Sequence, residues 1–169
     1  KYYPEFRVSI NLSYVQILKS PLMMELKQMI DHSGISCSGI IVELTESGYL
    51  EGTPAVRSVW NDMKQLRIQI ALDDFGTGYS NLMNISNLEP DIVKLDRGFT
   101  LKALSRSYEY QLMQYVIEMV HKLNQYVCVE GVETKEDLEK IKALGPDLIQ
   151  GYYYSKPCSR DEFLKKFFG

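Results

Sequence analysis

The stretch IQIALDDFGTG (68–78) decides the fold, because it reads as a β-strand followed by two adjacent carboxylates and a glycine-containing turn. Residues two apart in a strand share a face, so Ile70 and Leu72 point one way and Asp73 points the other. Where helices cover a sheet, the apolar side of such a strand packs against them. The stretch therefore predicts a polar site on the side of the sheet that faces away from the helices.

Short β-branched segments like this one alternate with longer segments of helical periodicity along the chain. The predicted strands cover residues 7–12, 39–45, 68–73, 92–96, 127–130 and 148–152. The predicted helices cover residues 15–32, 54–66, 82–88, 107–124, 135–144 and 160–168. This βα series predicts a parallel sheet, either an open doubly wound sheet or a closed (β/α) barrel.

The phase of the six strands decides between these two architectures. Each strand carries a polar residue near its C-terminal end, on the face opposite the one that meets helices. A (β/α) barrel builds its active site from such residues, whereas an open sheet would not bring all six together. We therefore predict an α/β fold of the TIM-like (β/α) barrel type, incomplete in this chain because it supplies about six βα units.

The composition narrows the classes of protein to which the chain can belong. A content of 45% hydrophobic and 24% charged residues is typical of one globular domain. The formal net charge of −3 argues against a broad basic surface for polymeric nucleic acid. No run reaches the roughly 20 apolar residues of a membrane span. Three cysteines without a CxxC pair indicate neither a disulfide framework nor a zinc site, and they favour the cytoplasm.

The polar residues predicted to meet at the mouth of the barrel are mostly carboxylates. They are Asn11, Glu43, Asp73, Lys94, Asp96, Glu130 and Gln150, joined by Glu46 and Asp74 just beyond two strands. Crowded carboxylates repel one another unless cations neutralise them. The two histidines lie on predicted helices, so the ligands are hard oxygens, which favour Mg²⁺ or Mn²⁺. Two such ions can clamp the oxygens of a phosphoryl displacement, which predicts phosphodiester hydrolysis.

Two features of the mouth have a structural as well as a functional interpretation. Lys94, in the middle of a barrel-facing strand, can be the partner of a neighbouring carboxylate rather than a catalytic group. Gly76 and Gly78 can permit a tight turn or a substrate-responsive loop.

Six short motifs follow one another along the chain: NLS (11–13), ELTES (43–47), DDFGTGYSNL (73–82), KLDRGF (94–99), EGVET (130–134) and QGYYYSKP (150–157). In this order they resemble the motifs of the EAL domain family of cyclic-di-GMP phosphodiesterases. The resemblance implies a modified eight-stranded barrel that hydrolyses cyclic-di-GMP to linear pGpG with Mg²⁺ or Mn²⁺ and is inhibited by Ca²⁺. It also implies that residues 1–169 are the C-terminal two-thirds of the domain, without the Glu-Ala-Leu stretch, and that this fragment alone is inactive.

The resemblance further implies roles for individual residues. The metal ligands are expected to be Asn11, Glu43, Asp73, Asp74 and Glu130. Glu130 is also the expected general base, and Lys94 is expected to orient the attacking water or offset phosphate charge. Support of the substrate or of the loops is expected from Glu46, Asp96, Glu133, Gln150, Gly76 and Gly78.

Other functions remain open on the sequence alone. One alternative is a catalytically inactive cyclic-di-GMP receptor or a regulatory protein-interaction module. Another is a glycosidase with two carboxylates and no metal, which the adjacent Asp73 and Asp74 and the lysine disfavour. The resemblance also implies a homodimer, and upstream sensory or GGDEF-type domains in a cytoplasmic parent protein with or without a membrane anchor.

Overall fold

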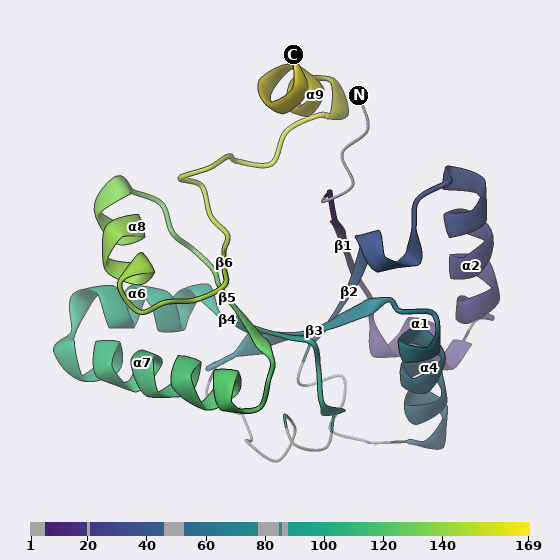
Figure 1. Ribbon diagram of the computed structural model, residues 1–169, viewed down its shortest axis with the longest axis horizontal. Coiled ribbons are helices and arrows are strands. Elements are labelled where there is room, and N and C mark those ends of the chain that lie inside the picture. The colour runs from purple at the N-terminus through teal and green to yellow at the C-terminus, as the bar shows by residue number, and fades with distance from the viewer. Residues whose placement is uncertain (1–5, 20, 46–52, 78–84, 86–87) are drawn as a thin grey trace.

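The computed structural model describes residues 6–19, 21–45, 53–77, 85 and 88–169, which form one six-stranded parallel sheet. The strands follow one another in chain order and are β1 (Val8–Asn11), β2 (Ile40–Thr45), β3 (Gln69–Phe75), β4 (Ile92–Leu95), β5 (Tyr126–Val129) and β6 (Leu148–Ile149). Figure 1 shows that the sheet curls and that helices lie outside it. This half-barrel confirms the predicted incomplete (β/α) barrel.

The helices flank the sheet in two groups (Figure 1). Beside β1 to β3 lie α1 (Tyr14–Lys19), α2 (Leu22–Ser33) and α4 (Pro54–Gln65), and a 3₁₀ turn, Cys37–Gly39, precedes β2. Beside β4 to β6 lie α6 (Arg97–Ser105), α7 (Ser107–Lys122) and α8 (Lys135–Lys142). The last helix, α9 (Arg160–Phe168), lies beside Phe6, whose ring packs edge-on against Phe163 and Phe168.

Two apolar clusters confirm the predicted phase of the strands. The larger cluster fills the space between sheet and helices, and includes Val42, Leu72, Val93 and Val129 from four neighbouring strands. The smaller cluster lies on the opposite face of the sheet and consists of Ile41, Ala71, Ile92 and Cys128. The alternation predicted from the sequence therefore holds across the middle of the sheet, and it gives the half-barrel an apolar interior layer.

The helices differ from the predictions in two places. The single helix predicted over residues 15–32 is divided into α1 and α2 around Pro21, which has no backbone N–H and fixes its own φ. Helix α6 was not predicted at all. It begins after Asp96, whose side chain accepts a hydrogen bond from the Gly98 N–H, and it buries Phe99 and Ala103 four residues apart.

The ends of two strands also differ from the predictions. Strand β3 continues to Phe75, and its register against β4 shifts between Leu72 and Phe75. Strand β6 stops at Ile149, three residues before the predicted end. The helix predicted over residues 82–88 lies mostly outside the described residues. Only Ile85 and Leu88 of this range are described, and both are helical and buried.

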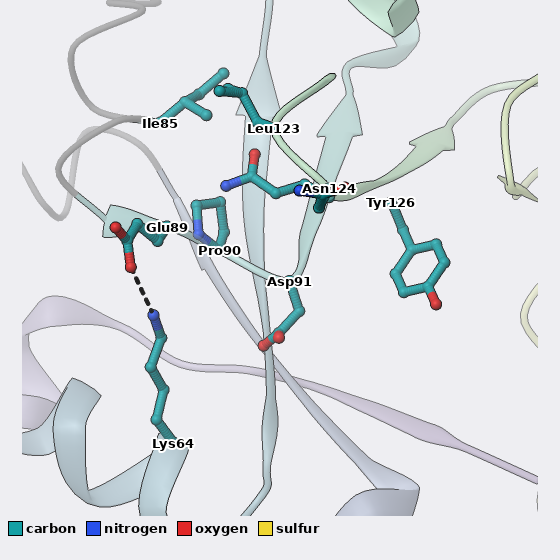
Figure 2. Close-up of a pocket in the computed structure, with 9 residues that line it drawn as sticks. Lys64, Ile85, Glu89, Pro90, Asp91, Leu123, Asn124 and Tyr126 are labelled. Carbon is teal, nitrogen blue, oxygen red and sulfur yellow. Dashed lines mark ion pairs between the residues drawn. The ribbon is translucent and has the colours of Figure 1, made fainter. Parts of the chain in front are cut away.

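Two aspartates, Asp91 and Asp147, hold the N-terminal ends of β3 and β5, and neither is a predicted site residue. Asp91 accepts a hydrogen bond from the Ile70 N–H, and Asp147 accepts one from the Val127 N–H, each at 2.8 Å. A cavity of about 380 Å³ lies beside Asp91 and is lined also by Lys64 and Glu89, which form an ion pair (Figure 2). None of the predicted site residues lines it, so it is not the candidate site.

No helix in the described ranges combines the length and the apolar character that crossing a membrane requires.

Candidate functional site

The candidate site is built around the ammonium group of Lys94, in the middle of β4. Its Nζ lies 2.6 Å from Glu43 Oε2, 2.7 Å from Glu130 Oε1 and 3.0 Å from Asp73 Oδ1. These carboxylates come from β2, β3 and the residue after β5. Both Lys94 and Glu43 are buried, with 4% and 7% of their surface exposed. The structure therefore brings four of the predicted site residues into direct contact on the inner face of the half-barrel.

Burial and the local charges shift the pKa values of two members of this cluster. Burial alone would lower the pKa of Lys94, but hydrogen bonds to Glu130 and Glu43 and the negative charge around them raise it well above its usual range. Burial raises the pKa of Glu130, and so do the charges of Asp73 and Glu43, although Lys94 opposes this shift. Three carboxylates around one ammonium carry a formal net charge of −2. A carboxylate with a raised pKa in such a cluster is a candidate proton acceptor.

Asp74 lies in the part of β3 where the register against β4 shifts. Adjacent residues in a regular strand point to opposite faces, but an irregularity of this kind places an extra residue against the partner strand. Asp74 has a φ of 61°, and its N–H donates to Asp73 Oδ1 at 3.0 Å. Burial and the charges of Asp73 and Asp96 raise the pKa of Asp74. The structure thus places Asp74 in the electrostatic field of the cluster.

Asn11 and Gln150 lie at the two outer strands of the sheet. Asn11 is exposed and is the register partner of Glu43, so it ends β1 at the same height as that carboxylate. Gln150 is also exposed, follows β6 directly, and continues its pairing through a backbone hydrogen bond to Val129. Both residues are at the mouth, but neither touches Lys94, so the contacts do not test their predicted roles.

Asp96, Glu133 and Gly76 lie in or beside the loops and do not contact Lys94. Asp96 caps α6, as described above, and Glu133 accepts two hydrogen bonds from the guanidinium of Arg97. Gly76 has a φ of 104°, and a Cβ there would lie 2.9 Å from Phe99 Cδ1, so the position requires glycine. Glu46 and Gly78 lie outside the described residues.

Cys128 borders the site, although it was not among the predicted site residues. Cys128 is the register partner of Lys94 and lies in the apolar layer beneath the cluster. Burial, together with the charge of Glu130, raises the pKa of its thiol to about 12 against the opposing charge of Lys94. A thiol with this pKa is not ionised at neutral pH, so Cys128 forms part of the floor of the site and is no nucleophile. The signal that places it there is its position two residues before Glu130, because residues two apart in a strand share a face.

The carboxylates also decide what the site can bind. Within the described ranges, no group of three or more His, Cys, Asp and Glu side chains stands ready to hold a metal ion, and Lys94 Nζ occupies the space between the three carboxylates. The oxygen donors nevertheless match the preference of Mg²⁺ and Mn²⁺. The excess of negative charge over the single ammonium favours further cations at the mouth.

Comparison with known proteins gives the family. The profile of the EAL domain matches residues 2–157. The chain is 32% identical over 154 residues to cyclic di-GMP phosphodiesterase PdeF of Escherichia coli, an alignment that covers 91% of this chain and 21% of PdeF.

Solved structures give the same result. The EAL enzyme Bd1971, in its cAMP and cyclic-di-GMP bound form, superposes with a TM-score of 0.90 and 30% identity over 96% of this chain and 43% of that one. The manganese and calcium complexes of Klebsiella pneumoniae BlrP1 with cyclic-di-GMP superpose with a TM-score of 0.83 and 26% identity, over 90% of this chain and 39% of that one. The chain therefore belongs to the EAL domain family.

Proposed function

We propose that this chain belongs to the catalytic domain of a phosphodiesterase that hydrolyses cyclic-di-GMP to linear pGpG. The observation that carries the proposal is the meeting of Glu43, Asp73 and Glu130 around Lys94 in a member of the EAL domain family. The relatives support the substrate, because PdeF is named a cyclic di-GMP phosphodiesterase and Bd1971 and BlrP1 were solved with cyclic-di-GMP. The chain covers less than half the length of each of these proteins, so the activity is proposed for the full natural polypeptide.

We propose that Mg²⁺ or Mn²⁺ serves this reaction. The residues that would hold the ions are Asn11, Glu43, Asp73, Asp74 and Glu130, whose oxygen donors fit these cations. When bound, such ions activate a water molecule and stabilise negative charge on the phosphate oxygens. The manganese and calcium complexes of BlrP1 support a site for divalent ions. Ca²⁺ is proposed to inhibit, because its looser coordination permits binding but supports little hydrolysis.

The residues of this chain then have distinct tasks in the hydrolysis. Glu130 takes a proton from the attacking water, and its raised pKa makes it a stronger proton acceptor than an ordinary glutamate. The water oxygen forms a bond to phosphorus while the bond from phosphorus to the 3′ oxygen breaks, and the leaving oxygen takes up a proton from solvent. Lys94 holds the Glu130 carboxylate at 2.7 Å and offsets the negative charge of the phosphate. The buried layer of Ile41, Ala71, Ile92 and Cys128 excludes water from beneath these groups.

Several features of the whole protein belong to the same proposal. Asp96, Glu133, Gln150 and Gly76 would shape the loops at the mouth, and Glu46 and Gly78 keep the supporting roles that the sequence predicts. Further strands of the natural polypeptide would complete the barrel beside β1 and β6, since the chain covers 43% of Bd1971. A homodimer, upstream sensory or GGDEF-type domains, and a cytoplasmic location of the domain also remain predictions.

The experiment that tests the proposal is the conversion of Asp73 to asparagine in the full natural polypeptide. We expect Asp73→Asn to abolish detectable pGpG production, because the amide removes a charge and a metal ligand that lies 3.0 Å from Lys94 Nζ. Glu130→Gln should also suppress turnover while binding of cyclic-di-GMP survives, since a base acts mainly on the transition state. The matched control is Asp161→Asn on α9, whose side chain is 92% exposed.

Turnover is measured as pGpG formation by chromatography at saturating Mg²⁺. Wild-type turnover in Asp73→Asn would refute the assignment of the site. A wild-type protein that binds cyclic-di-GMP but never cleaves it would instead be a receptor.

A further inference from the structure

Arg97 joins the two loops that follow β4 and β5. It is the first residue of α6, and its Nε and Nη2 donate hydrogen bonds to Glu133 Oε1 at 3.2 and 2.7 Å. Glu133 is three residues after Glu130, the proposed base. The hydrogen bonds therefore connect the end of the Lys94 strand to the short loop that begins at Glu130.

The aliphatic part of Arg97 holds the same loop at a second point. Gly131, which directly follows Glu130, has a φ of 78° and packs against Arg97. A Cβ at this position would lie 2.9 Å from Arg97 Cβ and 3.1 Å from Arg97 Cα, so no side chain fits between the two loops. Arg97 thus contacts the residue after Glu130 through its stem and Glu133 through its guanidinium.

The opposite side of this loop is fixed by backbone contacts. The Val132 N–H donates to the Gln150 carbonyl, and the Val132 carbonyl accepts from the Tyr153 N–H at 3.0 Å. The Val132 side chain is fully buried. With Arg97 on one side and these contacts on the other, residues 131–133 have little freedom, and the direction of the Glu130 side chain depends on them.

We propose that the ion pair between Arg97 and Glu133 is a latch that holds residues 131–133 in place. It thereby positions the Glu130 carboxylate beside Lys94, where it can accept a proton from the attacking water. This inference rests on the proposed function. Arg97 is a positioning residue, because it acts through the loop and not on the reacting atoms. The side chains of Arg97 and Glu133 are 58% and 39% exposed, and exposed ion pairs contribute little to global stability. The latch should therefore change the local order of the loop and the turnover number, but not the overall stability.

The test uses variants that separate the charge from the stem. Arg97→Met keeps most of the stem and removes the guanidinium, and the double variant Arg97→Glu/Glu133→Arg restores a pair with reversed charges. We expect kcat of Arg97→Met to fall about 10-fold with KM changed less than about twofold, because small displacements of a catalytic group are costly. The reversed pair should recover at least about half of the loss in log kcat. Arg106→Met, which removes the ion pair between the exposed Arg106 and the partly buried Glu109, is the control and should leave kcat unchanged.

Hydrogen exchange gives a readout that does not require turnover. In Arg97→Met the amides of residues 131–133 should exchange faster, while the melting temperature stays within about 2 °C of wild type. Unchanged kcat together with unchanged exchange would overturn the latch, and so would a loss of kcat that the reversed pair does not recover. If the wild-type protein does not cleave cyclic-di-GMP, the proposed function fails, and the exchange measurement alone decides whether Arg97 orders the loop.

Discussion

Replacing Lys94 with methionine removes the ammonium that Glu43, Asp73 and Glu130 share, while it keeps most of the volume of the side chain. In the metal-free protein the three carboxylates are then left facing one another with no cation between them. The side chain of Lys94 is 5% exposed, and those of its partners are 8%, 14% and 18% exposed. Water therefore does little to screen the repulsion, and the substitution should be strongly destabilising.

The size of the effect follows from this burial. Removing one partner of a buried ion pair typically costs about 3 to 5 kcal/mol, because it leaves an uncompensated buried charge. We expect a loss of this size in the free energy of unfolding. For a domain of this length, each kcal/mol corresponds to about 2 to 4 °C in melting temperature, which predicts a shift of roughly 6 to 20 °C. Lys64→Met is the matched control, because it also removes a lysine from an ion pair, but an exposed one. Lys64 Nζ lies 3.7 Å from Glu89 Oε2, and the two side chains are 37% and 78% exposed. This substitution should cost less than about 1 kcal/mol.

The assay is urea unfolding in the presence of a chelator, with circular dichroism as the probe. The m-value should stay unchanged if both variants retain the native fold. Addition of Mn²⁺ should stabilise Lys94→Met more than Lys64→Met, because the vacated space is lined by three hard oxygen donors. A loss in Lys94→Met no larger than that of Lys64→Met would refute the view that Lys94 neutralises the cluster.

The pH dependence of the free energy of unfolding provides an independent test of the cluster. The folded state raises the pKa of Glu130, so it binds a proton more tightly than the unfolded state does. Stability should consequently fall as pH rises above the ordinary pKa of a glutamate, about 4.3. In Lys94→Met the opposing charge is gone, so this fall should be steeper, and the difference from wild type should be smaller at about pH 5 than at about pH 8. A difference that does not change with pH would mean that the carboxylates are not coupled to Lys94.

Two further predictions concern residues away from the mouth. Cys158 is exposed and Cys128 is buried with a raised pKa, so a thiol reagent should label Cys158 in the native protein and Cys128 only after unfolding, as read by mass spectrometry. Asp147→Ala should lower the free energy of unfolding by about 1 to 2 kcal/mol, because it removes the partner of the Val127 N–H and of His121. A native protein labelled at Cys128, or an Asp147→Ala variant as stable as wild type, would contradict them.

The inner and outer faces of the strands could be predicted because their period of two is a local property. Lys94, for example, is inward because its neighbours Val93 and Leu95 belong to the core under the helices. The contact between Lys94 and Glu43 could not be predicted in the same way, because the two residues are 51 positions apart. Phase places both on one face, but the distance between their charged atoms depends on the register of β2, β3 and β4 and on the curl of the sheet.

The errors in the predicted helices and strands have a different cause. Helix α6 was missed because Gly98 and Thr100 lower the helical propensity of the segment, and tertiary burial of Phe99 and Ala103 outweighs them. Strand β6 is short because, after Ile149, the chain turns to pair with Val132 and not with a further strand. In both places long-range packing decided the structure, and a local pattern does not contain it.

The contact of Lys94 with three carboxylates is compatible with the proposed metal site for reasons of charge. One ammonium offsets one of the three carboxylates, and Asp74 adds a further acid whose pKa is raised by burial and by the charges of Asp73 and Asp96. A site of this kind becomes neutral only by taking up protons or cations. Protonation would remove the acceptor that the proposed hydrolysis needs at Glu130, whereas divalent ions would keep the carboxylates ionised. The excess of negative charge thus favours metal-assisted hydrolysis over a metal-free pair of acids, and it assigns to Lys94 the task of holding the carboxylates together when the ions are absent.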